Sequence, residues 1–194
     1  MKHILNRKQL ALVLFCGAIS LFLLLLSYKT VLVFTDLTPA QENVFSFLEG
    51  KTGLSPAFTV GEASHLEDVK KVMKYADYVF FILLLAVTVM ITYHRKNMSF
   101  VLRLLKYGGK TTVMAMLFLG ILSVFFFDPV FTLFHSIFFP QGNWTFPAES
   151  SLIQTFPLEF FISISRNIFL LTLFLGILFI LSEYFYRYVL RHRN

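Results

Sequence analysis

Four long apolar runs constrain this chain more than any other feature of its sequence. They cover residues 10–34, 75–93, 111–127 and 167–189. A helix needs about 20 apolar residues to cross roughly 30 Å of hydrocarbon. Inside a bilayer the backbone N–H and C=O groups find no water, so spans of this kind must be helical. The sequence therefore predicts an all-α membrane protein with four transmembrane helices.

The amino-acid composition supports the membrane class. Hydrophobic residues make up 57% of the chain and charged residues only 14%, whereas a soluble domain averages about 25% charged residues. The single cysteine excludes a disulfide framework, a cysteine-rich metal site and a thiol–disulfide oxidoreductase. The first run is longer than the roughly 7–15 apolar residues of a signal peptide and no small-residue cleavage site follows it, so we expect it to be retained.

The distribution of basic residues indicates which ends of the spans face the cytoplasm. Lys and Arg occur at both termini, and the connection 94–110 carries five of them and no acid. Because basic residues accumulate on the cytoplasmic side, we predict that both termini are cytoplasmic. Residues 1–194 should form a single membrane domain, in which the extracytoplasmic segments 35–74 and 128–166 form a cap. The net charge of +6 then reflects topology, and no nucleic-acid partner is expected.

The first extracytoplasmic segment contains clear helix signals. Thr38 as N-cap, Pro39 at the first helical position and Gly50 at the end predict a short helix. A loop rich in Gly, Ser and Pro follows it, and short strands within 35–62 remain an alternative. From about residue 59, apolar residues recur at spacings of three and four, which predicts a helix that continues into the second span.

The second extracytoplasmic segment begins with a helix breaker. Asp128 and Pro129 predict a break or kink near the outer end of the third span. The loop that follows contains aromatic residues typical of the membrane interface: Trp144, Phe146 and Phe156. Glu159 lies among further aromatic residues, where an unpaired carboxylate is costly. Arg166 is its expected ion-pair partner.

Two of the five histidines lie in the extracytoplasmic segments, namely His65 and His135. The others are interpreted as solvated cytoplasmic residues: His3, His94 and His192. Asp68 follows His65 by three residues and therefore lies on the same helical face. We expect it to accept a hydrogen bond from the imidazole and to raise the basicity of the other ring nitrogen.

Several kinds of chemistry are open to such a pair of histidines. A zinc site needs three or four ligands, and no spacing in the sequence supports one, so we expect no metal. Ser64 and Ser136 each adjoin a histidine, but neighbours on a helix point in different directions, and no G-x-S-x-G motif occurs. General acid–base catalysis by two imidazoles is the simplest functional interpretation, and two structural histidines are the alternative.

Three stretches of the extracytoplasmic segments resemble a bacterial family of four-span membrane proteins, the lipoprotein intramolecular transacylases. They are "EASHLEDVK" before the second span, "FHSIFF" after the third and "NWTFPAESSLIQTFPLEFF" before the fourth. The resemblance covers the whole chain in length and order of spans. One position departs from the family pattern, because an Asp is expected a few residues before Leu152, where this chain reads "ESS". The role of that acid falls to Glu149 or is absent here.

The resemblance implies movement of the sn-2 acyl chain of a diacylglyceryl-cysteine lipoprotein onto the α-amino group of the same cysteine. The product would be an N-acyl, lyso-form lipoprotein, made without a cofactor at the extracytoplasmic face of the cell membrane. Diacylglyceryl-modified lipoproteins and membrane lipid are the implied partners. The resemblance also implies that His65 and His135 form the catalytic pair.

The chemistry of this transfer needs one base and one acid, and the two histidines could take these roles in either order. An α-amine with a pKa of about 8 must lose a proton before it attacks, and we assign that step to His65. Protonation of the departing sn-2 oxygen is assigned to His135. The expected supporting residues are Asp68, Glu62 and Glu159. The expected substrate contacts are Trp144, Phe146, Phe134 and Arg166.

Two other functions compete with this interpretation. A non-catalytic four-helix scaffold would depend on helix packing at Gly120 and Gly176 and not on the histidines. A phospholipid acyl hydrolase or acyltransferase would use the same histidines on a different substrate. A channel or transporter is the weakest interpretation, because the first three spans carry no charged residue near their centres.

Overall fold

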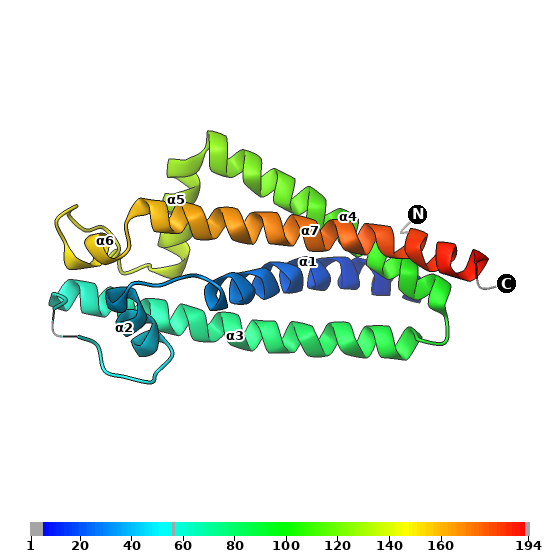
Figure 1. The fold of residues 1–194 in the computed structure, drawn as a ribbon, viewed down its shortest axis with the longest axis horizontal. Helices are drawn as coiled ribbons and strands as arrows, with labels where there is room; N and C mark the ends of the chain where they lie inside the picture. The colour runs from blue at the N-terminus through cyan, green and yellow to red at the C-terminus, as the bar shows by residue number, and fades with distance from the viewer. Residues whose placement is uncertain (1–5, 56, 193–194) are drawn as a thin grey trace. The chain divides into compact units, whose positions relative to one another are not determined.

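The computed structural model describes residues 6–55 and 57–192, and every regular element in these ranges is a helix. The helices are α1 (Arg7–Val33), α2 (Pro39–Leu48), α3 (Val60–His94), α4 (Met98–Phe125), α5 (Phe127–Phe138), α6 (Ser151–Thr155) and α7 (Leu158–Arg191) (Figure 1). Four of them, α1, α3, α4 and α7, are long and apolar enough to cross a membrane. The predicted all-α fold with four spans is confirmed, and the described part of 35–62 contains no strand.

The chain divides into two compact units. The first unit comprises Met1–Thr30, Val79–Gly120 and Asn167–Asn194, and the second comprises Val31–Tyr78 and Ile121–Arg166. The first unit contains most of the apolar length of the four long helices. The second contains α2, α5, α6 and the beginnings of α3 and α7, which together hold the extracytoplasmic segments predicted from the sequence.

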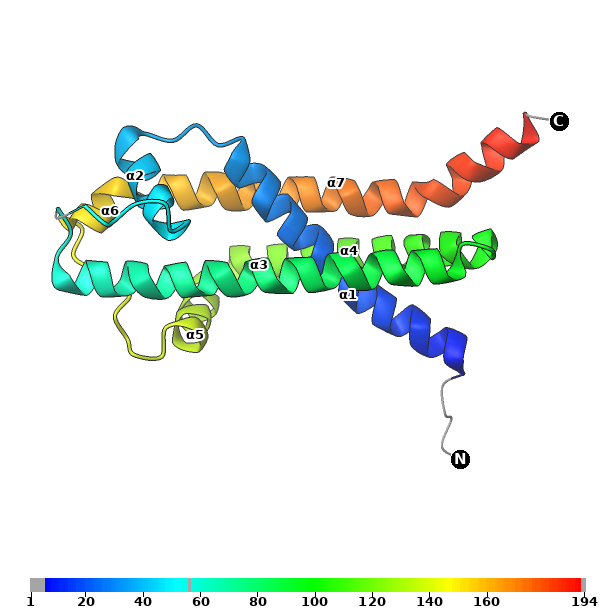
Figure 2. The same cartoon turned by 90° about the horizontal axis from the view of Figure 1, so that it is seen from below.

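The core of the first unit forms where α1 packs against α3 and α4. Phe15, Ile19 and Leu23 recur every four residues on one face of α1 and are almost completely buried. They pack with Phe100 and Leu104 of α4, and Figure 2 shows how obliquely α1 runs past the other helices of this unit. A stripe of this spacing is the normal way for a helix to bury one face.

Glycines bring α4 and α7 into backbone contact. A Cβ atom added to Gly109 would lie 2.5 Å from the carbonyl oxygen of Gly176, and one added to Gly176 would lie 3.0 Å from Val113. A Cβ atom on Gly120 would lie 3.0 Å from the ring of Phe169. The close packing expected at Gly120 and Gly176 is therefore confirmed, as is usual for small residues between membrane helices.

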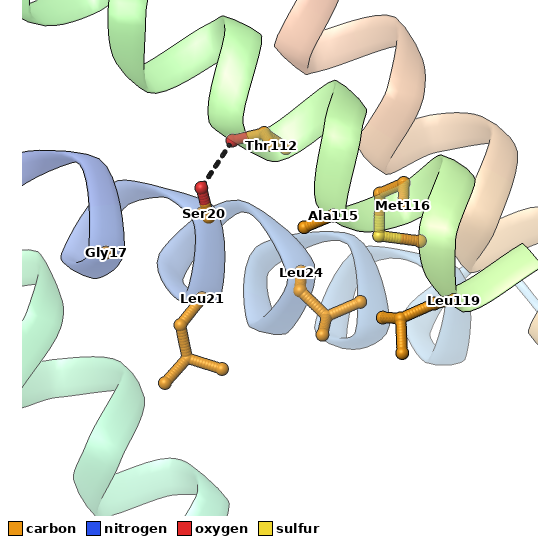
Figure 3. A pocket seen from close by; sticks show the side chains of 8 residues that line it. All are labelled: Gly17, Ser20, Leu21, Leu24, Thr112, Ala115, Met116 and Leu119. Atoms are coloured by element: carbon orange, nitrogen blue, oxygen red, sulfur yellow. Dashed lines mark hydrogen bonds between the residues drawn. The ribbon is translucent and has the colours of Figure 1, made fainter. Parts of the chain in front are cut away.

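A shallow groove runs between α1 and α4 in the first unit (Figure 3). Its cavity volume is about 220 Å³, and it is lined by Gly17, Ser20, Leu21, Leu24, Thr112, Ala115, Met116 and Leu119. Thr112 donates a hydrogen bond of 3.0 Å to the hydroxyl of Ser20. None of these lining residues is titratable, so the groove offers no side chain for acid–base chemistry.

The second unit is organised around α2. Thr38 caps this helix, and Gln41 completes a capping box with it, so the predicted start is confirmed. Gly50 follows the end of the helix with φ of +78°, a conformation that glycine adopts without strain. The side chain of Gln41 also donates a 2.9 Å hydrogen bond to the carbonyl of Thr155, which ties α2 to the end of α6.

Apolar residues from α2, α3 and α6 form the core of the second unit (Figures 1 and 2). The buried members are Val44, Phe47, Leu66, Leu152 and Phe156. Phe156 is only 7% exposed, so the prediction that it belongs to an interfacial belt is wrong. Phe156 ends α6 as its C-cap, and its ring contacts Phe45 and Phe160 inside the unit.

The chain breaks between α4 and α5 where the sequence predicted it. Phe126 has a non-helical backbone with φ of −135°, and Pro129 lies in the first turn of α5, where a proline costs no intrahelical hydrogen bond. The connection expected at 94–110 is much shorter, because α4 already begins at Met98. Asn97 accepts a hydrogen bond from the N–H of Phe100, and Phe100 is buried in the core, so the basic stretch is helical.

Candidate active site

A capping interaction fixes the helix that carries His65. The hydroxyl and N–H of Thr59 both donate to Oε2 of Glu62, at 2.8 and 2.7 Å, as in the helix-starting pattern T-x-x-E. His65 follows Glu62 by about one helical turn. Residues 60–74 carry six charged side chains and precede the apolar run 75–93. This part of α3 therefore lies outside the membrane-spanning segment.

Glu62 joins the beginning of α3 to α6. Its Oε1 accepts a 2.8 Å hydrogen bond from the N–H of Leu152, and the residue is 1% exposed. Burial acts to raise the pKa of Glu62, but hydrogen bonds from Leu152 and Thr59 outweigh it and lower the pKa. These contacts give Glu62 a structural role in positioning α3 and α6.

The imidazole of His65 lies between aromatic rings. Its centroid is 4.7 Å from Phe139 and 5.6 Å from Phe146. Burial lowers the pKa of His65, and the charge of His135 lowers it further. Asp68 acts in the opposite direction without reversing the shift. The aromatic surroundings therefore favour the neutral form of this imidazole.

His135 lies near the end of α5 and contacts aromatic rings on several sides. Its Nδ1 is 2.7 Å from the carbonyl oxygen of Phe131. A carbonyl oxygen only accepts, so Nδ1 carries a proton and Nε2 is left for other partners. The ring centroid lies 4.8 Å from Trp144 and 5.6 Å from Phe139. Because Phe139 also contacts His65, one buried ring connects the two histidines.

The sequence predicted that Asp68 accepts a hydrogen bond from His65, and this prediction is wrong. Within the described residues its carboxylate accepts from Lys71 at 2.8 Å, from Asn143 at 3.0 Å and from Gln141. The hydrogen bonds from Lys71 and Asn143 hold the pKa of Asp68 below its ordinary value. The carboxylate is therefore occupied by amide and ammonium donors, and it acts on His65 through space.

Gln141 and Asn143 are site residues that the sequence analysis missed. Both lie in the loop between α5 and α6, which runs beside the first turns of α3 (Figure 1). The only available signal was two amide side chains next to the single tryptophan in "PQGNW". The role of a polar loop residue can be inferred only when its partner is known. The partner here, Asp68, lies more than seventy positions earlier in the chain.

The structure brings some predicted residues together and leaves others apart. Trp144 contacts His135, and Phe146 contacts His65. Phe134 contacts the ring of His135 at 5.3 Å. Around the predicted acid position, Glu149 is exposed, and the hydroxyl of Ser150 caps α6 by accepting from the N–H of Ile153. The family's expected acid is therefore replaced at this helix start by a serine cap.

The predicted ion pair between Glu159 and Arg166 is absent from the ion pairs of the described residues. Both residues lie on α7 and are exposed. Seven residues correspond to about 10 Å along a helix, which is beyond direct contact. Within residues 6–55 and 57–192, no cluster of three or more His, Cys, Asp or Glu is arranged to hold a metal ion.

The fold and the site define a class of protein: a multi-pass, all-helical membrane protein with a paired-histidine site walled by aromatic rings. A family model described as lipoprotein intramolecular transacylase Lit matches residues 29–161. The chain belongs to this family of acyltransferases.

Two solved structures and one sequence relative are similar to this chain. The integral membrane transacylase Lit from Bacillus cereus has a TM-score of 0.78 at 20% identity, covering 96% of this chain and 97% of that chain. A variant of that protein with one histidine replaced by arginine gives 0.77. At this identity the likeness concerns the fold. An uncharacterized protein of Aquifex aeolicus (strain VF5) is 33% identical over 135 residues, which cover 63% of this chain and 57% of that protein.

Proposed function

We propose that the protein catalyses an intramolecular O-to-N acyl transfer on lipoproteins. The sn-2 acyl chain of a diacylglyceryl-modified N-terminal cysteine moves to the α-amino group of the same cysteine. Family membership supports this reaction. The observation that carries it is the arrangement of His65 and His135 around the ring of Phe139, while the hydrogen bond of His135 within the described residues uses Nδ1.

The proposed reaction needs one neutral and one protonated imidazole. Neutral His65 removes a proton from the ammonium, and the amine nitrogen attacks the sn-2 ester carbonyl. As the carbon–oxygen bond breaks, protonated His135 delivers a proton to the departing glyceryl oxygen. His135 then takes back the second proton that the attacking nitrogen loses, so ester and amine become alcohol and amide. The lowered pKa of His65 beside His135 supports assigning the base to His65, and such acid–base help contributes about 10²–10⁴-fold.

Both reacting groups belong to one substrate molecule, so the protein mainly has to bring them together. Holding amine and ester in an attack geometry supplies a high effective concentration. The aromatic walls favour this transfer over hydrolysis because they exclude water. In this proposal Trp144, Phe146 and Phe134 contact the glyceryl and acyl groups. The termini are cytoplasmic and the site faces the extracytoplasmic leaflet, where lipoproteins carry their lipid.

Mass spectrometry of a reporter lipoprotein tests the proposal directly. The N-terminal peptide is analysed from cells that express the wild-type chain or its His65→Ala, His135→Ala or His94→Ala variant. We expect N-acyl, lyso-glyceryl cysteine with wild type and with the His94 control, and unmodified diacylglyceryl cysteine with the other two. Diacylglyceryl cysteine in every sample, with all variants inserted in the membrane, contradicts the proposal. Released fatty acid without an acylated amine indicates a hydrolase.

A further inference from the structure

Two polar atoms in the candidate site are buried and lack a hydrogen-bond partner among the described residues. One is Nδ1 of His65 and the other is Oδ1 of Asn143. Buried polar atoms in folded proteins are nearly always paired, and each exception calls for an explanation. Both atoms belong to the second unit, and together they form a matched pair, because an amide oxygen only accepts and an imidazole nitrogen donates in one tautomer.

The amide nitrogen of Asn143 already makes two hydrogen bonds. It donates to Oδ2 of Asp68 at 3.0 Å and to the hydroxyl of Ser64 at 3.2 Å. Flipping the amide would set its oxygen against the carboxylate of Asp68, which only accepts, and turning the side chain away would lose both hydrogen bonds. Ser64 and Asp68 flank His65 on α3, so the amide oxygen is presented beside the histidine. The proximity of the Asn143 side chain to the imidazole acts to raise the pKa of His65.

We propose that Asn143 is a positioning residue that accepts a hydrogen bond from Nδ1–H of His65 and so leaves Nε2 as the free basic nitrogen. This inference rests on the proposed function for its catalytic meaning, since a base needs its lone pair on the nitrogen that faces the substrate. Asp68 then acts indirectly: its carboxylate accepts from the amide nitrogen of Asn143 and so orients the amide, and the amide oxygen selects the tautomer.

The tautomer of His65 is measurable in the full-length protein without any substrate. Protein labelled with ¹⁵N-histidine is purified in detergent, and the His65 signals are identified by their loss in His65→Ala. In wild type we expect neutral His65 to carry its proton on Nδ1 and a lone pair on Nε2. In Asn143→Ala the ratio of the Nδ1–H to the Nε2–H tautomer should fall about tenfold, the usual effect of one lost hydrogen bond.

Gln141→Ala is the matched control. Gln141 lies in the same loop and also donates to Oδ2 of Asp68, so its loss disturbs the carboxylate without removing the oxygen of Asn143. We expect its tautomer ratio to remain that of wild type. An unchanged ratio in Asn143→Ala, or an equal fall in both variants, overturns the proposal. If Asn143→Ala does not fold, Asn143→Leu keeps the side-chain bulk and should show the same tenfold fall.

Activity separates this inference from the proposed function. Acyl transfer by Asn143→Ala should show a lower kcat with little change in KM, because the base is misdirected while substrate contacts remain. If wild type lacks acyl transfer but the tautomer depends on Asn143, only the proposed function fails. If wild type transfers acyl chains and the His65 tautomer ratio is unchanged in Asn143→Ala, only the positioning role fails.

Discussion

Replacing the carboxylate of Glu62 by an amide should destabilise the second unit without touching the acid–base chemistry. The carboxylate is 1% exposed and accepts three hydrogen bonds, two from Thr59 and one from Leu152. In Glu62→Gln, one terminal atom becomes an NH₂ group, which cannot accept. Either the buried N–H of Leu152 or the partly buried N–H of Thr59 then loses its acceptor.

The expected magnitude follows from that one orphaned donor. A buried unsatisfied N–H costs about 1–3 kcal/mol, which corresponds to a fall of roughly 2–12 °C in melting temperature for a chain of this size. Glu62→Ala removes every acceptor and orphans two N–H groups, so about 2–6 kcal/mol is lost. The free energy of unfolding of a typical protein is only about 5–15 kcal/mol. Glu62→Gln is therefore the better test, because it removes a smaller part of this stability than Glu62→Ala.

Thermal unfolding in detergent measures the effect, with Glu67→Gln as the control. Glu67 lies on the same helix and is exposed, so its substitution should leave the melting temperature unchanged. The folded pKa of Glu62 is lowered, so its stabilising contribution is present above the ordinary pKa and is lost as pH falls through the folded value. The destabilisation should therefore vanish in acid. A Glu62→Gln protein with wild-type stability and no activity would refute a structural role and indicate a catalytic carboxylate.

Two further predictions concern the pH dependence and the helix packing. The charge of Asp68 raises the pKa of His65. In wild type we expect the acidic limb of the kcat/KM profile below pH 6.5, and Asp68→Asn should move it to lower pH. A shift to higher pH contradicts the assignment of His65 as the base. Gly109→Ala forces its Cβ to within 2.5 Å of a backbone oxygen and should cost about 1–3 kcal/mol. Gly17→Ala, with open space around it, should not lower the melting temperature in detergent.

The sequence was a good guide wherever structure depends on near neighbours. Apolar runs require spanning helices, and Thr38 and Pro39 start α2 because a cap and a fixed φ act within a single turn. The break before Pro129 is of the same kind. Two local features were nevertheless readable and missed: "TVGE" contains the capping pattern that engages Glu62, and a separation of seven residues already argued against pairing Glu159 with Arg166.

The partners of Asp68 lay beyond such reasoning. Helical spacing correctly placed Asp68 near His65, but it could not reveal that amides from a distant loop occupy the carboxylate first. Which acceptor an imidazole uses depends on the competition among all donors nearby, and most of those donors come from elsewhere in the chain. The role of Asn143 therefore required the structure.

In both histidines we assign a proton to Nδ1, but different groups hold it there. His135 has its Nδ1 proton fixed by a carbonyl one turn earlier on its own helix, a contact that persists as long as α5 is helical. His65 depends on the amide of Asn143, which depends in turn on Asp68 and on the loop between α5 and α6. Substitution of Asn143 should therefore affect the base and leave the acid unchanged. Such an asymmetry separates the two roles experimentally, because a loop variant with an altered His65 tautomer and an unaltered His135 tautomer isolates the proton-abstraction step.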